Sequence, residues 1–186
     1  MKDSEPILYD ELLSQCKKGN PSAYTALYEK HAKELYNTIF RIVQHSGEAE
    51  DVLQDTFIAA FKGIAQFEQR SSFAAWIKRI AINQSISVLR KRKIRFVETE
   101  IDVLGETVDE ASLDESDFQF KVDAVKDAIN QLSPGYRTVV QLYLLDGIPQ
   151  EEIAQILGIT NSTVRTQYHR AKQQIIMTLK KSRVYE

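Results

Sequence analysis

The spacing of apolar residues predicts helices along most of the chain. Apolar side chains recur every three or four residues, and no segment alternates polar and apolar residues as a half-buried strand would. We therefore expect an all-α fold. The predicted helices cover 5–18, about twenty residues from Ser22, a segment from Ser46 or Gly47 to Ile64, a segment after Ser71 or Ser72, and four more that begin near Phe118, at Pro134, at Pro149 and after Thr160. The helix from Pro134 is expected to bury Leu142, Tyr143 and Leu144.

The segment that starts at Phe73 has apolar residues on two sides. At about 100° per residue, Phe73 and Ile77 fall on one face, and Ile82 and Ile86 fall on the opposite face. A helix with this pattern is expected to lie between other helices. Between the two faces runs a narrow polar strip, which consists of Arg79, Asn83 and Arg90.

Aromatic and basic residues are interleaved in and around this segment. Such surfaces bind single-stranded nucleic acid, because bases stack on aromatic rings and cations neutralise phosphates. A core helix with a solvated basic end would give the same composition, since Lys and Arg also favour helix C-termini. The aromatic residues are Phe67, Phe73 and Trp76, and the basic ones are Arg70, Lys78, Arg79, Arg90, Lys91, Arg92, Lys93 and Arg95.

The helix before this stretch carries an acidic outer face. Its apolar stripe includes Val52 and Phe57, and Asp51, Asp55 and Ile58 lie on the other side. The two aspartates are one turn apart, an arrangement that costs on the order of 0.2–0.5 kcal/mol in an isolated helix. An ordinary solvated face and a docking surface for a basic partner both fit this pattern.

The most specific local pattern is a helix-turn-helix in 148–175. Pro149 suits the start of its first helix, Gly158 the sharp turn, and Thr160 the N-cap of its second helix. The outer face of the second helix can donate to base edges and phosphates in a major groove. Its residues are Ser162, Thr166, His169 and Gln173, flanked by Arg165 and Arg170. This pattern predicts DNA binding, and an ordinary helical hairpin with a basic surface is the alternative.

Charge is distributed unevenly along the chain. The formal net charge of −2 and the pI near 6.0 argue against a generally basic nucleic-acid-binding protein. Residues 153–183, however, hold six basic residues and no acidic one, so the local field there favours a phosphate backbone. Residues 96–117 hold nine acidic residues, no basic residue and no helical period, and we interpret them as a flexible linker.

Composition excludes several classes of site. The single cysteine, Cys16, rules out an internal disulfide and a multi-cysteine zinc site, and the three histidines lack metal-ligand spacing. No apolar run approaches the roughly 20 residues of a membrane span. The N-terminus lacks the pattern of a secretory signal. We expect no cofactor, no metal, no membrane insertion and a cytoplasmic location.

Two long motifs in this chain resemble the extracytoplasmic-function (ECF) sigma factors of bacterial RNA polymerase, members of the sigma-70 family. Region two of that family is similar to AEDVLQDTFIAAFKGIAQFEQRSSFAAWIKRIAINQSISVLRKRK, and region four is similar to LSPGYRTVVQLYLLDGIPQEEIAQILGITNSTVRTQYHRAKQQI. The resemblance implies two small helical domains, a region 2 bundle at 1–95 and a region 4 helix-turn-helix at 118–186, joined by the linker at 96–117. It implies a protein that is not an enzyme, binds core RNA polymerase and directs promoter-specific transcription initiation.

The resemblance also implies where region two makes its contacts. The outer face of the acidic helix would bind the clamp helices of the polymerase β′ subunit through Asp51, Gln54, Asp55 and Ile58. The following loop and helix would capture unstacked non-template bases of the minus-ten promoter element and so aid promoter melting. By position, the residues of this second contact are Phe67, Arg70, Ser71, Ser72, Trp76, Lys78, Arg79 and Asn83.

Region four would read the minus-thirty-five duplex and pack on the β-subunit flap. The chain departs from the family's usual residues at Gln69 and Arg70, where a glycine is common, and at Gln167 and Tyr168, where a basic residue and a leucine are common. The resemblance leaves open whether an anti-sigma protein binds this chain. The implied duplex-reading residues are Ser162, Thr163, Arg165, Thr166, His169, Arg170 and Lys172.

Two other functions fit part of the pattern. A stand-alone helix-turn-helix regulator would bind duplex palindromes without polymerase, but it gives no role to the acidic face or to the aromatic and basic loop. An enzyme that used Asp51 and Asp55 with His45 would need a nucleophile–base set, a glycine-rich phosphate loop or a metal cluster, and the sequence has none of these.

Overall fold

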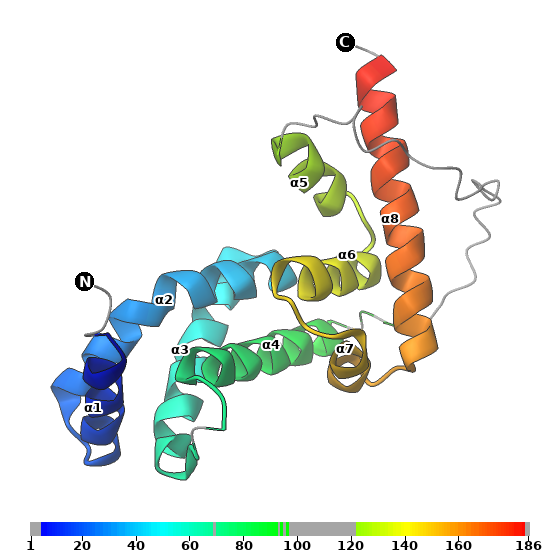
Figure 1. Ribbon diagram of the computed structural model, residues 1–186. Coiled ribbons are helices and arrows are strands. Elements are labelled where there is room, and N and C mark those ends of the chain that lie inside the picture. Colours follow the sequence, from blue (N-terminus) through cyan, green and yellow to red (C-terminus); the bar gives the residue numbers. More distant parts are fainter. Residues whose placement is uncertain (1–4, 69, 93, 95, 97–121, 185–186) are drawn as a thin grey trace. The chain divides into compact units, whose positions relative to one another are not determined.

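The expectation of an all-α fold is confirmed over the part of the chain that the computed structural model describes, in which every regular element is a helix (Figure 1). The described residues are 5–68, 70–92, 94, 96 and 122–184. The predicted acidic linker lies outside them, apart from Phe96. The chain forms two compact units, Met1–Lys93 and Ile94–Glu186.

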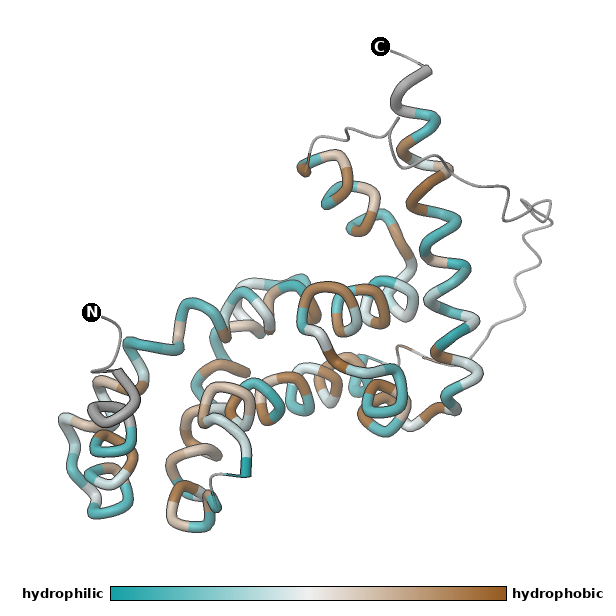
Figure 2. The backbone as a smooth tube through the Cα atoms, in the orientation of Figure 1, coloured by the Kyte–Doolittle hydropathy of each residue, from teal (hydrophilic) through white to brown (hydrophobic). Residues whose placement is uncertain are grey.

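The first unit is a bundle in which α2, α3 and α4 pack on one another, while α1 packs on α2 and on the short helix η1. Hydrophobic positions recur along each of these helices (Figure 2). Asn20 caps α2 by accepting a hydrogen bond from the Ser22 amide at 3.0 Å. The elements are α1 (Glu5–Lys17), α2 (Pro21–Val43), α3 (Ser46–Gly63), η1 (Ile64–Gln66) and α4 (Phe73–Lys91).

Helix α4 packs on two helices, α2 and α3, as its two-sided pattern predicts. Phe73 and Ile77 on one face and Ile82 and Ile86 on the other are all buried. Burial of one such side chain stabilises the fold by roughly 1.5–3 kcal/mol. A helix held from both sides has little freedom to shift, so the residues on its remaining polar strip have defined positions.

The second unit is built around the long helix α8, which contacts α5, α6 and α7. Helices α7 and α8 form the predicted helix-turn-helix. Gly158 turns the chain with φ 68°, and the Thr160 hydroxyl accepts a hydrogen bond from the Thr163 amide at 3.1 Å. The elements are α5 (Val122–Asn130), α6 (Pro134–Val140), a π-helical segment (Gln141–Leu145), α7 (Gln150–Leu157) and α8 (Asn161–Val184).

The π-helical segment corrects one expectation about the core. The amide of Asp146 donates to the carbonyl of Gln141 at 3.1 Å, which is the wider turn of a π-helix. Leu142 is fully buried as predicted, but Leu144 is 53% exposed and Leu145 is 52% exposed. Tyr143 is exposed as well. The predictions that Tyr143 and Leu144 are buried are wrong because the wider turn rotates these side chains away from the positions that a continuous α-helix would give them.

Candidate nucleic-acid interface and docking face

Phe67 anchors the start of the predicted strand-binding loop. Its side chain is buried, with its ring stacked on Trp76 at 4.9 Å and edge-on to Phe73 at 5.9 Å between ring centroids. Its amide donates to the carbonyl of Ile64 at 3.2 Å, and its own carbonyl accepts a hydrogen bond from Lys17 Nζ at 3.0 Å. Phe67 is therefore a core residue in this structure, and its ring is not presented to a base.

Ser72 anchors the other end of the loop. Its hydroxyl accepts a hydrogen bond from the amide of Ala75 at 3.2 Å and so caps α4, which confirms one of the two predicted capping residues. Arg70 and Ser71 are exposed between the anchors. Arg70 forms an ion pair with Glu68 at 2.7 Å, but both side chains are open to water, so the pair restrains Arg70 only weakly. The loop thus offers a cation and hydroxyls on a fixed base.

The predicted strand-binding residues of α4 differ in burial and in their contacts within the protein. Lys78 forms an ion pair with Glu34 of α2 at 2.8 Å. The hydrogen bond from Lys78, together with its charge, lowers the pKa of the Glu34 carboxyl. Arg79 and Asn83, on the polar strip, are exposed, and Trp76 is half-buried near the loop. Of the predicted strand-binding residues on α4, Lys78 therefore already has a partner within the bundle.

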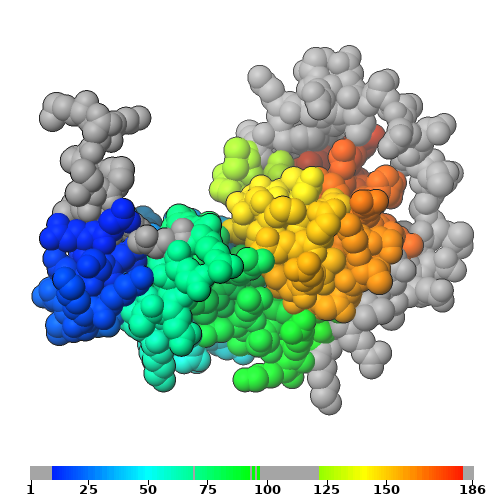
Figure 3. Space-filling model, turned by 60° about the horizontal axis from the view of Figure 1, so that its bottom comes forward, coloured from blue at the N-terminus to red at the C-terminus, as the bar shows by residue number. Residues whose placement is uncertain are grey.

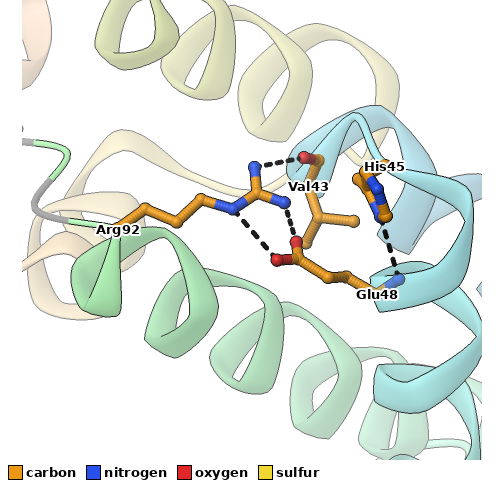
Figure 4. Close-up of polar contacts among 4 residues, drawn as sticks. All are labelled: Val43, His45, Glu48 and Arg92. Carbon is orange, nitrogen blue, oxygen red and sulfur yellow. Dashed lines mark hydrogen bonds and ion pairs between the residues drawn. The ribbon is translucent and has the colours of Figure 1, made fainter.

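Arg92 belongs to a contact between three helices (Figure 4). Its guanidinium donates to the carbonyl of Val43 at 2.8 Å and to Glu48 Oε1 at 3.2 Å, and it also pairs with Glu48 Oε2. The Glu48 amide in turn donates to His45 Nδ1 at 3.3 Å, which caps α3. The sequence placed Arg92 in one basic cluster with Arg90, and the structure gives it a different role, the joining of α2, α3 and α4.

The predicted polymerase-binding residues lie on one exposed face of α3. Asp51, Gln54, Asp55 and Ile58 are all exposed, and Ile58 is 51% exposed despite its apolar side chain. An open groove between α3 and α4 runs beside this face. Its lining includes Asp55, Ile58, Lys62, Ser87 and Lys91. The face therefore offers two carboxylates, an amide and an apolar side chain next to a groove, which suits a basic amphipathic partner.

The predicted duplex-reading residues lie along the N-terminal half of α8. Asn161 Nδ2 donates to Glu151 Oε1 at 3.1 Å and ties the start of α8 to α7. Backbone and Asn161 hydrogen bonds, with a smaller effect from the charge of Arg165, lower the pKa of Glu151. Ser162, Arg165, His169, Arg170 and Lys172 are exposed, while Thr163 and Thr166 are partly buried.

Two residues of α8, Gln167 and Tyr168, differ from those usual in the sigma family, and each contacts another residue of the second unit. Gln167 is buried, and its Nε2 donates to the carbonyl of Phe96, a residue that is itself buried. Tyr168 packs edge-on against Tyr143 with 4.9 Å between ring centroids. Gln167 therefore contacts the protein rather than solvent, and no local sequence pattern indicated its partner 71 residues earlier.

Leu144 and Leu145 form an exposed apolar patch next to the helix-turn-helix, on the segment coloured yellow in Figure 3. Tyr143 is 36% exposed and borders this patch. Contiguous exposed apolar residues on a small unit often mark a protein contact.

The described ranges contain neither a metal-ligand cluster nor a membrane-spanning helix. No group of three or more His, Cys, Asp or Glu residues there could hold a metal ion. Within the same ranges no helix is long and apolar enough to cross a membrane.

Family descriptions match both units of the chain. Sigma-70 region 2 matches residues 27–94, and Sigma-70, region 4 matches residues 123–175. Among similar proteins, the ECF RNA polymerase sigma factor SigW of Bacillus subtilis is 30% identical over 177 residues, which cover 90% of this chain and 94% of SigW. The RNA polymerase sigma factor YlaC of the same organism is 31% identical over 164 residues, which cover 86% of this chain and 94% of YlaC.

Solved structures agree with this assignment. The sigma factor RpoE from Bartonella quintana, in complex with the anti-sigma factor NepR, aligns with a TM-score of 0.54 and 25% identity over 84% of this chain and 96% of that chain. CnrH, in complex with the cytosolic domain of CnrY, shares the fold with a TM-score of 0.55 and 22% identity over 92% of this chain and 97% of that chain. This protein therefore belongs to the ECF sigma factors of the sigma-70 family, which are not enzymes, and directs promoter-specific initiation of transcription by RNA polymerase.

Proposed function

We propose that the two units divide promoter recognition between them. The first unit binds core polymerase through α3 and holds the opened minus-ten strand on Arg70 and Ser71, which lie in the loop between Phe67 and Ser72. The second unit reads the minus-thirty-five duplex with α8. In this proposal residues 1–95 form the part that binds polymerase and the minus-ten strand, residues 118–186 form the part that reads the duplex, and residues 96–117 link them. The observation that carries the proposal is that Arg70 and Ser71 are exposed between two anchored residues, Phe67 and Ser72.

Strand capture rests on what this loop and the adjacent helix expose. Arg70 and Arg79 can neutralise phosphates, and Ser71 and Asn83 can bond to base edges. The half-buried ring of Trp76 is the aromatic group that lies nearest to solvent in this set. A stacked base contributes about 1–3 kcal/mol, so capture of one or two unstacked bases offsets a comparable share of the cost of melting.

Polymerase binding rests on the face formed by Asp51, Gln54, Asp55 and Ile58. Its carboxylates favour a basic partner, and its exposed isoleucine supplies apolar area on the same face. We place the clamp helices of the β′ subunit there. The patch formed by Leu144 and Leu145 is placed against the β-subunit flap.

Duplex reading rests on Arg165, Arg170 and Lys172 together with the polar residues near the start of α8. Each unit alone would hold its element weakly. Because both units belong to one chain, binding of one element raises the effective concentration of the other unit at its own element.

An anti-sigma protein is a further expected partner. The similar sigma factor RpoE was solved in complex with the anti-sigma factor NepR, and CnrH, which shares the fold, was solved in complex with the cytosolic domain of CnrY. We also expect the protein to act in the cytoplasm, where polymerase and promoter DNA are present. The whole proposal is tested by adding the purified protein to core polymerase and measuring promoter-dependent transcription. Absence of any binding to core polymerase would contradict it.

A further inference from the structure

Helix α1 reaches the base of the strand-binding loop from outside the matched part of the chain. The region 2 description begins at residue 27, whereas α1 ends at Lys17. Lys17 Nζ nevertheless donates a hydrogen bond to the carbonyl of Phe67 at 3.0 Å, across 50 residues of sequence. Phe67 is the last buried residue before the exposed loop, so this bond acts where the loop leaves the core.

The end of α1 is itself held in place. Leu13 and Cys16 are buried, and the hydroxyl of Tyr24 donates to the carbonyl of Cys16 at 2.7 Å. The chain then turns at Gly19, whose φ of 79° suits glycine. The ammonium of Lys17 therefore extends from a fixed backbone, and its position in the last turn also suits the negative end of the helix dipole.

Phe67 is fixed in three ways, of which one depends on α1. Its ring packs between Phe73 and Trp76, and its amide bonds to Ile64. These contacts fix the ring and the amide nitrogen of Phe67. The orientation of the peptide group between Phe67 and Glu68 depends instead on the hydrogen bond that the Phe67 carbonyl accepts from Lys17. A charged donor at a carbonyl makes a stronger hydrogen bond than a neutral one, so Lys17 fixes the direction in which the loop begins.

We propose that Lys17 is a positioning residue for capture of the minus-ten strand, acting through the Phe67 carbonyl and not by touching DNA. The inference rests on the proposed function of Arg70 and Ser71 in the loop that follows Phe67. A loop whose first peptide is already oriented loses less conformational freedom when a strand binds, and this raises the affinity for the strand. Helix α1 is then part of the strand-binding apparatus.

The chain provides a matched control for this inference. Lys18 is the next residue, carries the same charge and is exposed, and no hydrogen bond or ion pair of its side chain is recorded in the described part of the chain. We would compare Lys17→Met, Lys17→Arg and Lys18→Met. Methionine keeps the length and helix propensity of lysine but has no donor, and arginine restores a charged donor.

The measurement is binding of a fluorescent single-stranded oligonucleotide to the holoenzyme. The oligonucleotide carries the non-template sequence that the wild-type holoenzyme selects from a random library. We expect Lys17→Met to weaken binding about three- to tenfold, in line with loss of one hydrogen bond. We expect Lys17→Arg to recover most of that loss and Lys18→Met to bind like wild type. Affinity for core polymerase should be unchanged in all three variants. Lys17→Met should lower the free energy of unfolding by about 0.5–1.5 kcal/mol, the contribution of one hydrogen bond, and so leave the protein folded under the conditions of the assay.

Salt dependence distinguishes positioning from direct phosphate contact. Affinity for a single strand falls with salt, and loss of one phosphate contact reduces the magnitude of the slope of log affinity against log salt by about 0.7. We expect the slope for Lys17→Met to equal the wild-type slope. A shallower slope for Lys17→Met would overturn the positioning role. Equal losses of oligonucleotide affinity for Lys17→Met and Lys18→Met would overturn it as well.

A loop variant separates this inference from the proposal on which it rests. Arg70→Ala with Ser71→Ala should weaken oligonucleotide binding if the loop captures the strand. If that variant loses affinity while Lys17→Met does not, the role of Lys17 is wrong and the role of the loop stands. If the loop variant binds like wild type, the proposed function of the loop is wrong, and the inference about Lys17 is overturned with it.

Discussion

Arg92, the residue that follows α4, forms an ion pair with Glu48 in the first turn of α3. The same guanidinium bonds to the carbonyl of Val43, at the end of α2. One side chain thus joins the ends of three helices whose other contacts are mostly apolar (Figure 4).

Removal of this contact should destabilise the first unit. We expect Arg92→Ala to lower the free energy of unfolding by about 1–2 kcal/mol, because hydrogen bonds from a charged group are lost at a partly exposed site. Trp76 is the only tryptophan, so urea unfolding followed by its fluorescence reports on this unit. Lys91→Ala, at the exposed neighbouring position, is the control and should change stability by less than about 0.5 kcal/mol. Equal stability of the two variants would contradict the role given to Arg92.

Charge reversal on α3 should prevent assembly with polymerase. We expect Asp51→Arg with Asp55→Arg to abolish binding to core polymerase while the circular dichroism spectrum stays unchanged, because both side chains are exposed and neither supports the fold. Asp10→Arg with Glu11→Arg reverses the same number of charges on α1 and should bind normally. Native gel shift or co-purification with core polymerase measures both, and normal binding by the α3 variant would refute this docking face.

Loss of one cation on α8 should weaken duplex recognition. We expect Arg165→Ala to reduce affinity for the minus-thirty-five duplex by about 1–3 kcal/mol if Arg165 makes a bidentate base contact. Lys126→Ala removes one positive charge elsewhere in the same unit and should have little effect. Fluorescence anisotropy with specific and scrambled duplexes separates a base contact from a phosphate contact. An equal loss on both duplexes would show that Arg165 does not read the sequence.

Acid should remove the stabilising effect of the Glu34–Lys78 pair. The pKa of Glu34 in the folded protein is lower than its ordinary value of 4.5, so the unfolded chain takes up this proton first as the pH falls. The pair therefore contributes its full stability above that value and loses it as the pH falls through the lower, folded pKa. We expect Glu34→Gln to be less stable than wild type near neutral pH, with the difference shrinking in acid.

The size of this effect should be small, since the Glu34 side chain is 64% exposed. Urea unfolding at several pH values measures it, with Glu29→Gln on the exposed surface of the same helix as the control. A difference between wild type and Glu34→Gln that does not change with pH would contradict the assignment.

The sequence by itself determined which segments form helices and where several of these helices begin, because both depend on residues close together in the chain. The two-sided apolar pattern from Phe73 predicted a helix buried between others. Thr160 caps α8 as predicted, and Ser72, one of the two residues predicted for the cap of α4, caps that helix. The family followed from two long motifs. Periodicity and capping are local properties, so the sequence alone was sufficient for them.

The tertiary structure decided which predicted site residues remain available for a ligand. Phe67 is buried, Lys78 is paired with Glu34, and Arg92 joins three helices, although each looked like part of a nucleic-acid surface. Their partners lie tens of residues away, and local spacing carries no information about which distant helix lies opposite a given side chain. The same reason accounts for Lys17, which has no motif of its own and is identified only by its bond to the Phe67 carbonyl.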